Sequence, residues 1–291
     1  MKNAIRVLKI FAKKFTSSDS AGLAAEMSYS LILSLFPLLL LFVSILSMWQ
    51  SPGAIASLSR VLGAILPPDI HQPIDKTIQS ILRESDKSLL TLSLIFSLFS
   101  IFTVFNVVIK AMERIYEVKQ RLKFFSRIRI SIELGLIIGI SFLIVFNLLI
   151  FGYEVEEFLV NEWKWLWAKT AFQIIKFPIA FLVMVYSALM VYKFSLRVGQ
   201  KLECVIPGAF VMALLWTVLN ANFGLYLQYQ RFGTYTQFVK LIVLPLWMYA
   251  NAMVFLIGAH INWMFYTNIL QPEMFKRKKV PRTSRTARTN S

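Results

Sequence analysis

Polar and ionisable side chains inside long apolar stretches are the residues of this chain best placed to do chemistry. Asn106, Lys110 and Glu113 recur at i, i+4 and i+7, so they share one face of a helix, on which Lys110 and Glu113 could pair. Glu26 and His260 lie near the ends of two other apolar stretches, at similar predicted depth. If these stretches lie in lipid, polar groups there are costly and therefore informative. We expect Glu26, Lys110 and His260 to line a polar crevice that opens toward the cytoplasm, with helix anchoring as the alternative.

Asparagines recur in the last two apolar stretches of the chain. Asn220 and Asn222 fall in the fifth stretch, while Asn251 and Asn262, about three turns apart on one helix face, fall in the sixth. Their amides could form hydrogen bonds between helices, either as simple packing contacts or as part of the polar site. The candidate residues of the crevice are Glu26, Tyr29, Asn106, Lys110, Glu113, Asn220, Asn251, His260 and Asn262.

The residues that common catalytic centres need are missing from the sequence. His71 and His260 are the only histidines and are predicted on opposite sides of the membrane, and Cys204 is the single cysteine, so neither a metal site nor an internal disulfide is expected. The chain has no G-x-x-x-x-G-K-[ST] phosphate loop and no G-x-S-x-G elbow. We expect no catalytic residue, no bound metal, no cofactor and no enzyme activity.

Long apolar elements must position these side chains. Hydrophobic residues make up 57% of the 291 positions and charged residues only 16%, which excludes an ordinary soluble domain. Uncharged runs of about 20 residues match the thickness of a bilayer, and in lipid such runs form helices because every backbone N–H and C=O needs a partner. The sequence predicts an all-α membrane bundle with six spans: Met27–Met48, Leu89–Ile109, Ile132–Phe151, Phe172–Tyr192, Val205–Leu227 and Phe238–Phe265.

The connecting segments alternate between many and few basic residues along the chain. The chain has 31 Lys+Arg against 15 Asp+Glu, and because the excess lies beside the spans, no nucleic-acid partner is expected. Basic residues are dense before the first span, between the second and third, after the fourth and after the sixth. The positive-inside rule therefore predicts a multi-pass membrane protein with both termini in the cytoplasm.

Two basic segments flank the membrane domain. In residues 1–26, apolar and basic side chains recur on opposite sides of a helix: Ile5, Leu8, Ala12 and Phe15 against Lys2, Arg6, Lys9 and Lys13. We expect this helix to lie on an anionic leaflet, with a basic leader that only sets topology as the alternative. Residues 267–291 are basic and rich in Ser and Thr, so a disordered tail beside the same anionic leaflet is expected.

The membrane domain, residues 27–266, carries one long extracytoplasmic connection. Residues 50–88 show two amphipathic repeats interrupted by Pro67-Pro68, which predicts a helical hairpin that caps the bundle or lies on the outer leaflet. Docking of an envelope protein partner on this hairpin is the alternative. Prolines in or at the mouths of the spans are expected to bend the helices: Pro37, Pro178, Pro207 and Pro245.

Short motifs occur in order along the membrane domain. The first span contains Tyr29 followed by Ser34-Leu35-Phe36-Pro37-Leu38-Leu39-Leu40. The second half contains Pro207-Gly208-Ala209, Leu215-Trp216, Gly224, Tyr226, Gly233-Thr234-Tyr235, Leu246-Trp247-Met248-Tyr249 and Gly258-Ala259-His260-Ile261-Asn262. From Ala21 to Asn262 the chain thereby resembles the YihY/BrkB family. It departs at Tyr235-Thr236-Gln237, where the family usually has Tyr-Gly-Ser, and at Gly258-Ala259-His260, where it usually has Gly-Ala-Glu.

The resemblance implies a bacterial inner-membrane (plasma-membrane) protein with six spans and a role in transport or envelope maintenance. At the second departure, His260 would replace an acidic group with an ionisable imidazole. Members of the family have been labelled ribonuclease BN. A ribonuclease needs metal ligands, or a general acid and base on one accessible surface, and this sequence shows neither.

Three function classes follow from these observations. The leading hypothesis is a transporter or translocator of a lipid or another amphiphile, because the spans are bent and partly polar and no energy-coupling motif is present. The second is a non-transporting scaffold that recruits an envelope partner through the hairpin or the basic tail. The third and least favoured is a ribonuclease.

Overall fold

Helices and the short turns between them make up the part of the chain that the computed structural model describes, which is residues 2–48, 76, 87–118, 122–150, 166–196, 200–229, 236–267 and 269. The helices are α1 (Lys2–Ser17), α2 (Ser20–Met48), α5 (Lys87–Ile115), α6 (Phe124–Ile150), α8 (Leu166–Phe194), α9 (Leu202–Tyr229) and α10 (Thr236–Tyr266). The predicted all-α fold class is confirmed. Most of the predicted hairpin (50–88) and nearly all of the predicted tail (267–291) lie outside the described residues.

Six of these helices are long and apolar enough to cross a membrane, as the sequence predicts. The qualifying segments are Ser20–Leu39, Leu94–Ile115, Phe124–Val145, Phe177–Phe194, Leu202–Phe223 and Ile242–Tyr266. Each of the six helices begins before its predicted span, and α2 and α6 do so by the most residues, at Ser20 and Phe124. Glu26, which precedes the first predicted span, therefore lies inside α2, in its second turn.

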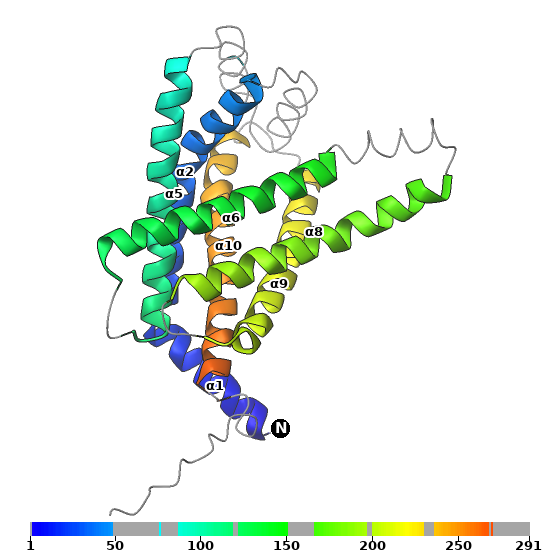
Figure 1. The fold of residues 1–291 in the computed structure, drawn as a ribbon. Coiled ribbons are helices and arrows are strands. Elements are labelled where there is room, and N and C mark those ends of the chain that lie inside the picture. The colour runs from blue at the N-terminus through cyan, green and yellow to red at the C-terminus, as the bar shows by residue number, and fades with distance from the viewer. Residues whose placement is uncertain are drawn as a thin grey trace, which may run out of the picture.

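The six long helices form a closed ring of neighbours. Around the ring, α2 packs on α5, α5 on α6, α6 on α8, α8 on α9, α9 on α10, and α10 returns to α2 (Figure 1). α6 and α8 lie side by side and cross the other helices obliquely. The short helix α1 packs on α10 and α2 at one end of the ring, and this end, with the nearer half of each helix, is called the α1 half below.

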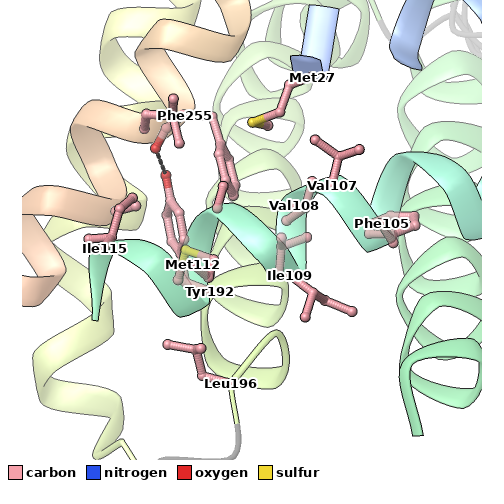
Figure 2. Packing of buried hydrophobic residues seen from close by; sticks show 14 of the residues in the cluster. Met27, Phe105, Val107, Val108, Ile109, Met112, Ile115, Tyr192, Leu196 and Phe255 are labelled. Carbon is pink, nitrogen blue, oxygen red and sulfur yellow. Dashed lines mark hydrogen bonds between the residues drawn. The ribbon is translucent and has the colours of Figure 1, made fainter. Parts of the chain in front are cut away.

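Burial is concentrated in the α1 half. Side chains that the structure buries there include Leu23, Met27, Ile109, Met112, Ile115, Leu134, Tyr192, Val205 and Leu256, several of which Figure 2 shows packed together. In the other, distal half of α5, Leu94, Ile95, Phe96, Leu98 and Phe99 are all between 44% and 67% exposed. Ser97 and Ser100, which share one face of the same stretch, are buried, so neighbouring helices cover one narrow face there and leave the rest exposed.

Two glycines let α9 and α10 cross closely within the α1 half. A Cβ atom on Gly208 would overlap the carbonyl oxygen of Gly258, and a Cβ on Gly258 would overlap the hydroxyl of Tyr192. That hydroxyl donates a hydrogen bond of 2.7 Å to the carbonyl oxygen of Phe255 (Figure 2). Small residues of this kind allow backbones to approach where lipid gives helices no hydrophobic reason to associate.

Serines of neighbouring helices donate hydrogen bonds to the carbonyl oxygens of two of the prolines that were expected to bend the spans. Ser97 of α5 donates to the carbonyl oxygen of Pro37 in α2 at 2.7 Å. Ser28 of α2 donates to the carbonyl oxygen of Pro245 in α10 at 3.1 Å. These two hydrogen bonds join α5 to α2 and α2 to α10 at the levels of the prolines.

Candidate functional site

Three ion pairs join the end of α5 to α1 and α2 in the α1 half. They are Glu26–Lys110 (2.7 Å), Asp19–Arg114 (3.4 Å) and Lys14–Glu117 (2.5 Å). Lys110 and Arg114 lie one turn apart on α5, and Glu117 follows in the turn after the helix; we call the three pairs the ion-pair ladder. The ladder brings together Glu26 and Lys110, two of the residues proposed for the crevice.

The innermost pair of the ladder is half-exposed although it lies within two membrane-spanning segments. The side chain of Lys110 is 52% exposed and that of Glu26 is 39% exposed. Tyr29, one turn further along the same face of α2, is 65% exposed. Because an isolated charge in lipid is costly, the surface there is suited to opposite charges or dipoles of a headgroup.

The outermost pair holds a buried cation. The side chain of Lys14 is only 8% exposed, and its ammonium group lies 4.8 Å from the ring centre of Trp263. Its partner Glu117 is 77% exposed, beyond the membrane-spanning part of α5. The hydrogen bond from Lys14, and then its charge, lower the pKa of Glu117. Lys14 therefore anchors α1 to both α5 and α10.

A second charged cluster closes the connection between α5 and α6. Arg127 donates to the side-chain oxygen of Asn106 at 2.9 Å and to the carboxylate of Glu113 at 2.5 Å. The other oxygen of Glu113 accepts from the backbone N–H of Leu122 at 3.0 Å, and the Arg127 Nε donates to the carbonyl of Leu122 at 3.2 Å. We call Asn106, Glu113, Leu122 and Arg127 the α5–α6 clasp.

The clasp corrects one expectation drawn from spacing. Lys110 and Glu113 do not pair with each other, because Lys110 reaches α2 while Glu113 turns toward α6. Arg127 was not among the candidate residues, since its place between two apolar stretches suggested a topology signal only. The signal available in the sequence was that Glu113 and Arg127 flank the end of the second predicted span and the start of the third, at similar depth.

His260 lies in a separate, fully buried environment beneath α1. Its Nδ1 lies 2.7 Å from the carbonyl oxygen of Leu256, so this nitrogen carries the hydrogen, and its Nε2 lies 3.5 Å from the Ser20 hydroxyl. The rings of Phe11 and Phe15 lie 5.9 and 5.0 Å from the imidazole ring, centre to centre. Among the described residues, no hydrogen bond or ion pair joins His260 to the Glu26–Lys110 pair.

The asparagines of α10 form the predicted bonds between helices. Asn251 accepts a hydrogen bond from Asn220 of α9 at 3.2 Å, and the Trp247 indole donates to Asn220 at 2.9 Å. Nearer α1, the side-chain oxygen of Asn262 accepts from the backbone N–H of Gly208 at 2.7 Å. These contacts link α9 to α10 at two levels, while the buried Nδ2 of Asn262 has no hydrogen-bond partner among the described residues.

No gathering of three or more His, Cys, Asp or Glu side chains suited to a metal occurs within the described ranges. What the arrangement offers instead is a mixed-charge surface at Glu26 and Lys110 next to apolar helix faces. Such a surface can bind a charged or zwitterionic headgroup.

Comparisons with known proteins agree with this architecture. A family model described as virulence factor BrkB matches residues 11–282. The ribonuclease-like protein YfkH of Bacillus subtilis (strain 168) is 24% identical over 280 residues, which cover 94% of this chain and 97% of that protein. No solved structure matches the chain. With a match over nearly its whole length and six helices able to span a membrane, the chain belongs to the BrkB family of membrane proteins.

Proposed function

We propose that this protein moves a lipid or another amphiphile across the bacterial inner membrane, in the service of envelope maintenance. The half-exposed Glu26–Lys110 pair within the spans is the observation that carries the proposal. A zwitterionic headgroup carries both a cation and an anion. It can therefore exchange partners with the pair, its ammonium meeting Glu26 and its phosphate meeting Lys110.

The surface beyond the pair suits the apolar part of such a molecule. On α2, Tyr29, Leu33 and Phe36 follow Glu26 on one helix face and are between 55% and 65% exposed. On α5, Phe99 lies on the same line as Lys110 and is 67% exposed. A headgroup at the ion pair would thus leave its acyl chains beside apolar side chains in the distal half.

A lipid-scrambling assay in proteoliposomes tests the proposal. Fluorescent phospholipids in the outer leaflet are quenched by dithionite, and the unquenched fraction reports movement between leaflets. We expect the wild-type protein to scramble lipids and the double variant Glu26→Gln, Lys110→Gln to be slower by about tenfold, the loss of roughly one charge-assisted contact. The matched control is Glu133→Gln, Arg129→Gln, which removes an exposed ion pair within α6.

Two results would refute the proposal. One is wild-type scrambling no faster than empty vesicles for zwitterionic and anionic phospholipids alike. The other is a rate for the Glu26, Lys110 double variant that equals that of the α6 control. The scaffold alternative depends on residues 50–88 and 267–291, most of which lie outside the described part of the chain.

We further propose that the protein is not a ribonuclease, although its Bacillus subtilis relative is described as ribonuclease-like. His260 is covered by α1, and Glu113 is 6% exposed and held by Arg127. Neither can meet an RNA backbone as an acid or base in this arrangement. Incubation of the purified protein with labelled RNA should give no cleavage; cleavage abolished by a single substitution in the chain would contradict this.

A further inference from the structure

The helix α1 presents three different faces. Phe11, Lys14 and Phe15 form the face that contacts α10 and the turn after α5. Ile5 and Leu8 form a second face, 53% and 71% exposed. A single helix with one protein-facing side and one uncovered apolar side is placed at a boundary between protein and another apolar phase.

The third face of α1 is basic. Arg6, Lys9 and Lys13 are spaced at i, i+3 and i+7 and are exposed, and with Ile5 and Ile10 they line a shallow, open hollow. None of the three cations forms an ion pair with a residue that the structure describes. Their charge is therefore available to an external anion.

The orientation of these faces is fixed by the rest of the protein. A two-residue linker, Ser18 and Asp19, joins α1 to α2, and the Ser20 hydroxyl donates to the carbonyl oxygen of Phe15 at 2.8 Å. The Asp19 carboxylate accepts from the backbone N–H of Gly22 at 3.3 Å, which caps the start of α2. Together with the buried Lys14, these contacts hold the basic face in one direction relative to the ring.

We propose that the basic face of α1 binds the headgroups of anionic phospholipids in the leaflet at the α1 end of the bundle. Lipid phosphates meet Arg6, Lys9 and Lys13, while Ile5 and Leu8 enter the boundary between headgroups and acyl chains. A bilayer fits both faces at once. RNA would satisfy the cations and leave the two apolar side chains in water, so the pairing of faces favours lipid. This inference is independent of lipid translocation.

Hydrogen–deuterium exchange of the full chain in nanodiscs tests the inference. We compare phosphatidylcholine alone with phosphatidylcholine containing phosphatidylglycerol, and follow the backbone amides of Lys2–Ser17. In the wild type, phosphatidylglycerol should slow their exchange by about tenfold, and high salt should reverse the effect. The triple variant Arg6→Gln, Lys9→Gln, Lys13→Gln should lose this dependence. The control Lys123→Gln, Arg129→Gln, Lys201→Gln removes three cations elsewhere and should keep it.

Three results would contradict the inference, and one comparison serves as a control. Equal exchange in the two lipid compositions for the wild type, or the same slowing in the triple variant, would overturn it. So would slowing caused by a single-stranded RNA oligonucleotide in phosphatidylcholine nanodiscs, if it required the same three cations and phosphatidylglycerol had no effect. Equal exchange of wild type and triple variant in phosphatidylcholine alone would confirm that the variant keeps α1 docked through Lys14.

Discussion

The absence of a Cβ atom at Gly258 allows α9 and α10 to approach each other closely. Gly258 faces the Tyr192 hydroxyl and the carbonyl oxygen of Gly208, with no room for a Cβ. Gly139, in α6, has no heavy atom within 4 Å of the place where its Cβ would lie. The same added methyl group therefore meets protein at one position and open surroundings at the other.

We predict that Gly258→Ala lowers the free energy of unfolding by about 1–3 kcal/mol, because the helices must move apart to admit the methyl group. Gly139→Ala should be neutral or stabilising by up to about 1 kcal/mol, since alanine favours the helix. Thermal unfolding of both variants in one detergent gives the comparison. Equal effects of the two substitutions would show that the close crossing is not formed.

The Lys14–Glu117 pair should respond to pH in a defined direction. Lys14 lowers the pKa of Glu117 below its ordinary value of 4.5 in the folded protein. Its contribution to the docking of α1 is therefore complete above pH 4.5 and is lost as the pH falls through the lowered folded value. Because the Glu117 side chain is 77% exposed, water screens the pair.

We predict that Glu117→Gln weakens α1 docking at pH 7 by about 0.5–1 kcal/mol, and that the difference from wild type disappears at pH values below the lowered pKa. Amide exchange of Lys2–Ser17, corrected for the intrinsic rate at each pH, measures the effect. Glu133→Gln, in an exposed pair within α6, should leave the exchange of α1 unchanged. A difference that persisted undiminished in acid would rule out ionisation of Glu117 as its cause.

At the scale of the elements, the α5–α6 clasp is the contact whose loss should cost most. Glu113 and Arg127 are 6% and 15% exposed, whereas Glu133 and Arg129 of the neighbouring pair are 47% and 78% exposed. Removing one partner of a buried pair leaves the other charge without compensation. When one partner of the exposed pair is removed, water or lipid headgroups can solvate the remaining charge.

We predict that Glu113→Gln and Arg127→Gln each lower the free energy of unfolding by about 3–5 kcal/mol, while Arg129→Gln leaves it nearly unchanged. The double variant Glu113→Gln, Arg127→Gln should cost less than the sum of the single changes, because no unpaired charge remains. Chemical unfolding followed by circular dichroism measures all four variants. Strict additivity would mean that the two side chains do not interact.

The helices themselves could be predicted from sequence, but their partners could not. Long apolar runs identify six spans because lipid leaves the backbone no other solution. The third helix begins at Phe124 rather than Ile132, because Arg127 finds Glu113 and Arg129 finds Glu133 once the helices are packed. The Arg129–Glu133 pair is a local i, i+4 contact, but the Arg127–Glu113 pair depends on which helices are neighbours, and no local pattern contains that information.

The same limit applies to the faces of α1. Periodicity grouped Ile5, Leu8, Ala12 and Phe15 as the apolar side; the first three are exposed in the structure, whereas Phe15 packs against His260. The side that contacts the protein carries Phe11 and Lys14. A sequence pattern separates apolar from charged positions, but it cannot tell a lipid-facing residue from a protein-facing one, because both surroundings are apolar.

At the scale of the whole molecule, the α1 half and the distal half differ in what surrounds their side chains. The α1 half contains the buried core, the clasp and the ion-pair ladder. The described side chains of the distal half of α5 are mostly exposed, except on the narrow face of Ser97 and Ser100. In a bilayer, lipid replaces neighbouring helices around such a segment, so we expect the two halves to contribute unequally to stability.

Two isoleucines of α5 allow the contributions of the two halves to stability to be compared. Ile109 is fully buried in the α1 half, and Ile95 is 57% exposed in the distal half. We predict that Ile109→Ala lowers the free energy of unfolding by about 2–4 kcal/mol, because it leaves a cavity among packed helices. Ile95→Ala should change it by less than about 1 kcal/mol, since lipid fills the space and is as apolar as the side chain removed. Denaturant unfolding in mixed micelles measures both, and equal costs would require the distal halves to pack against one another in the membrane.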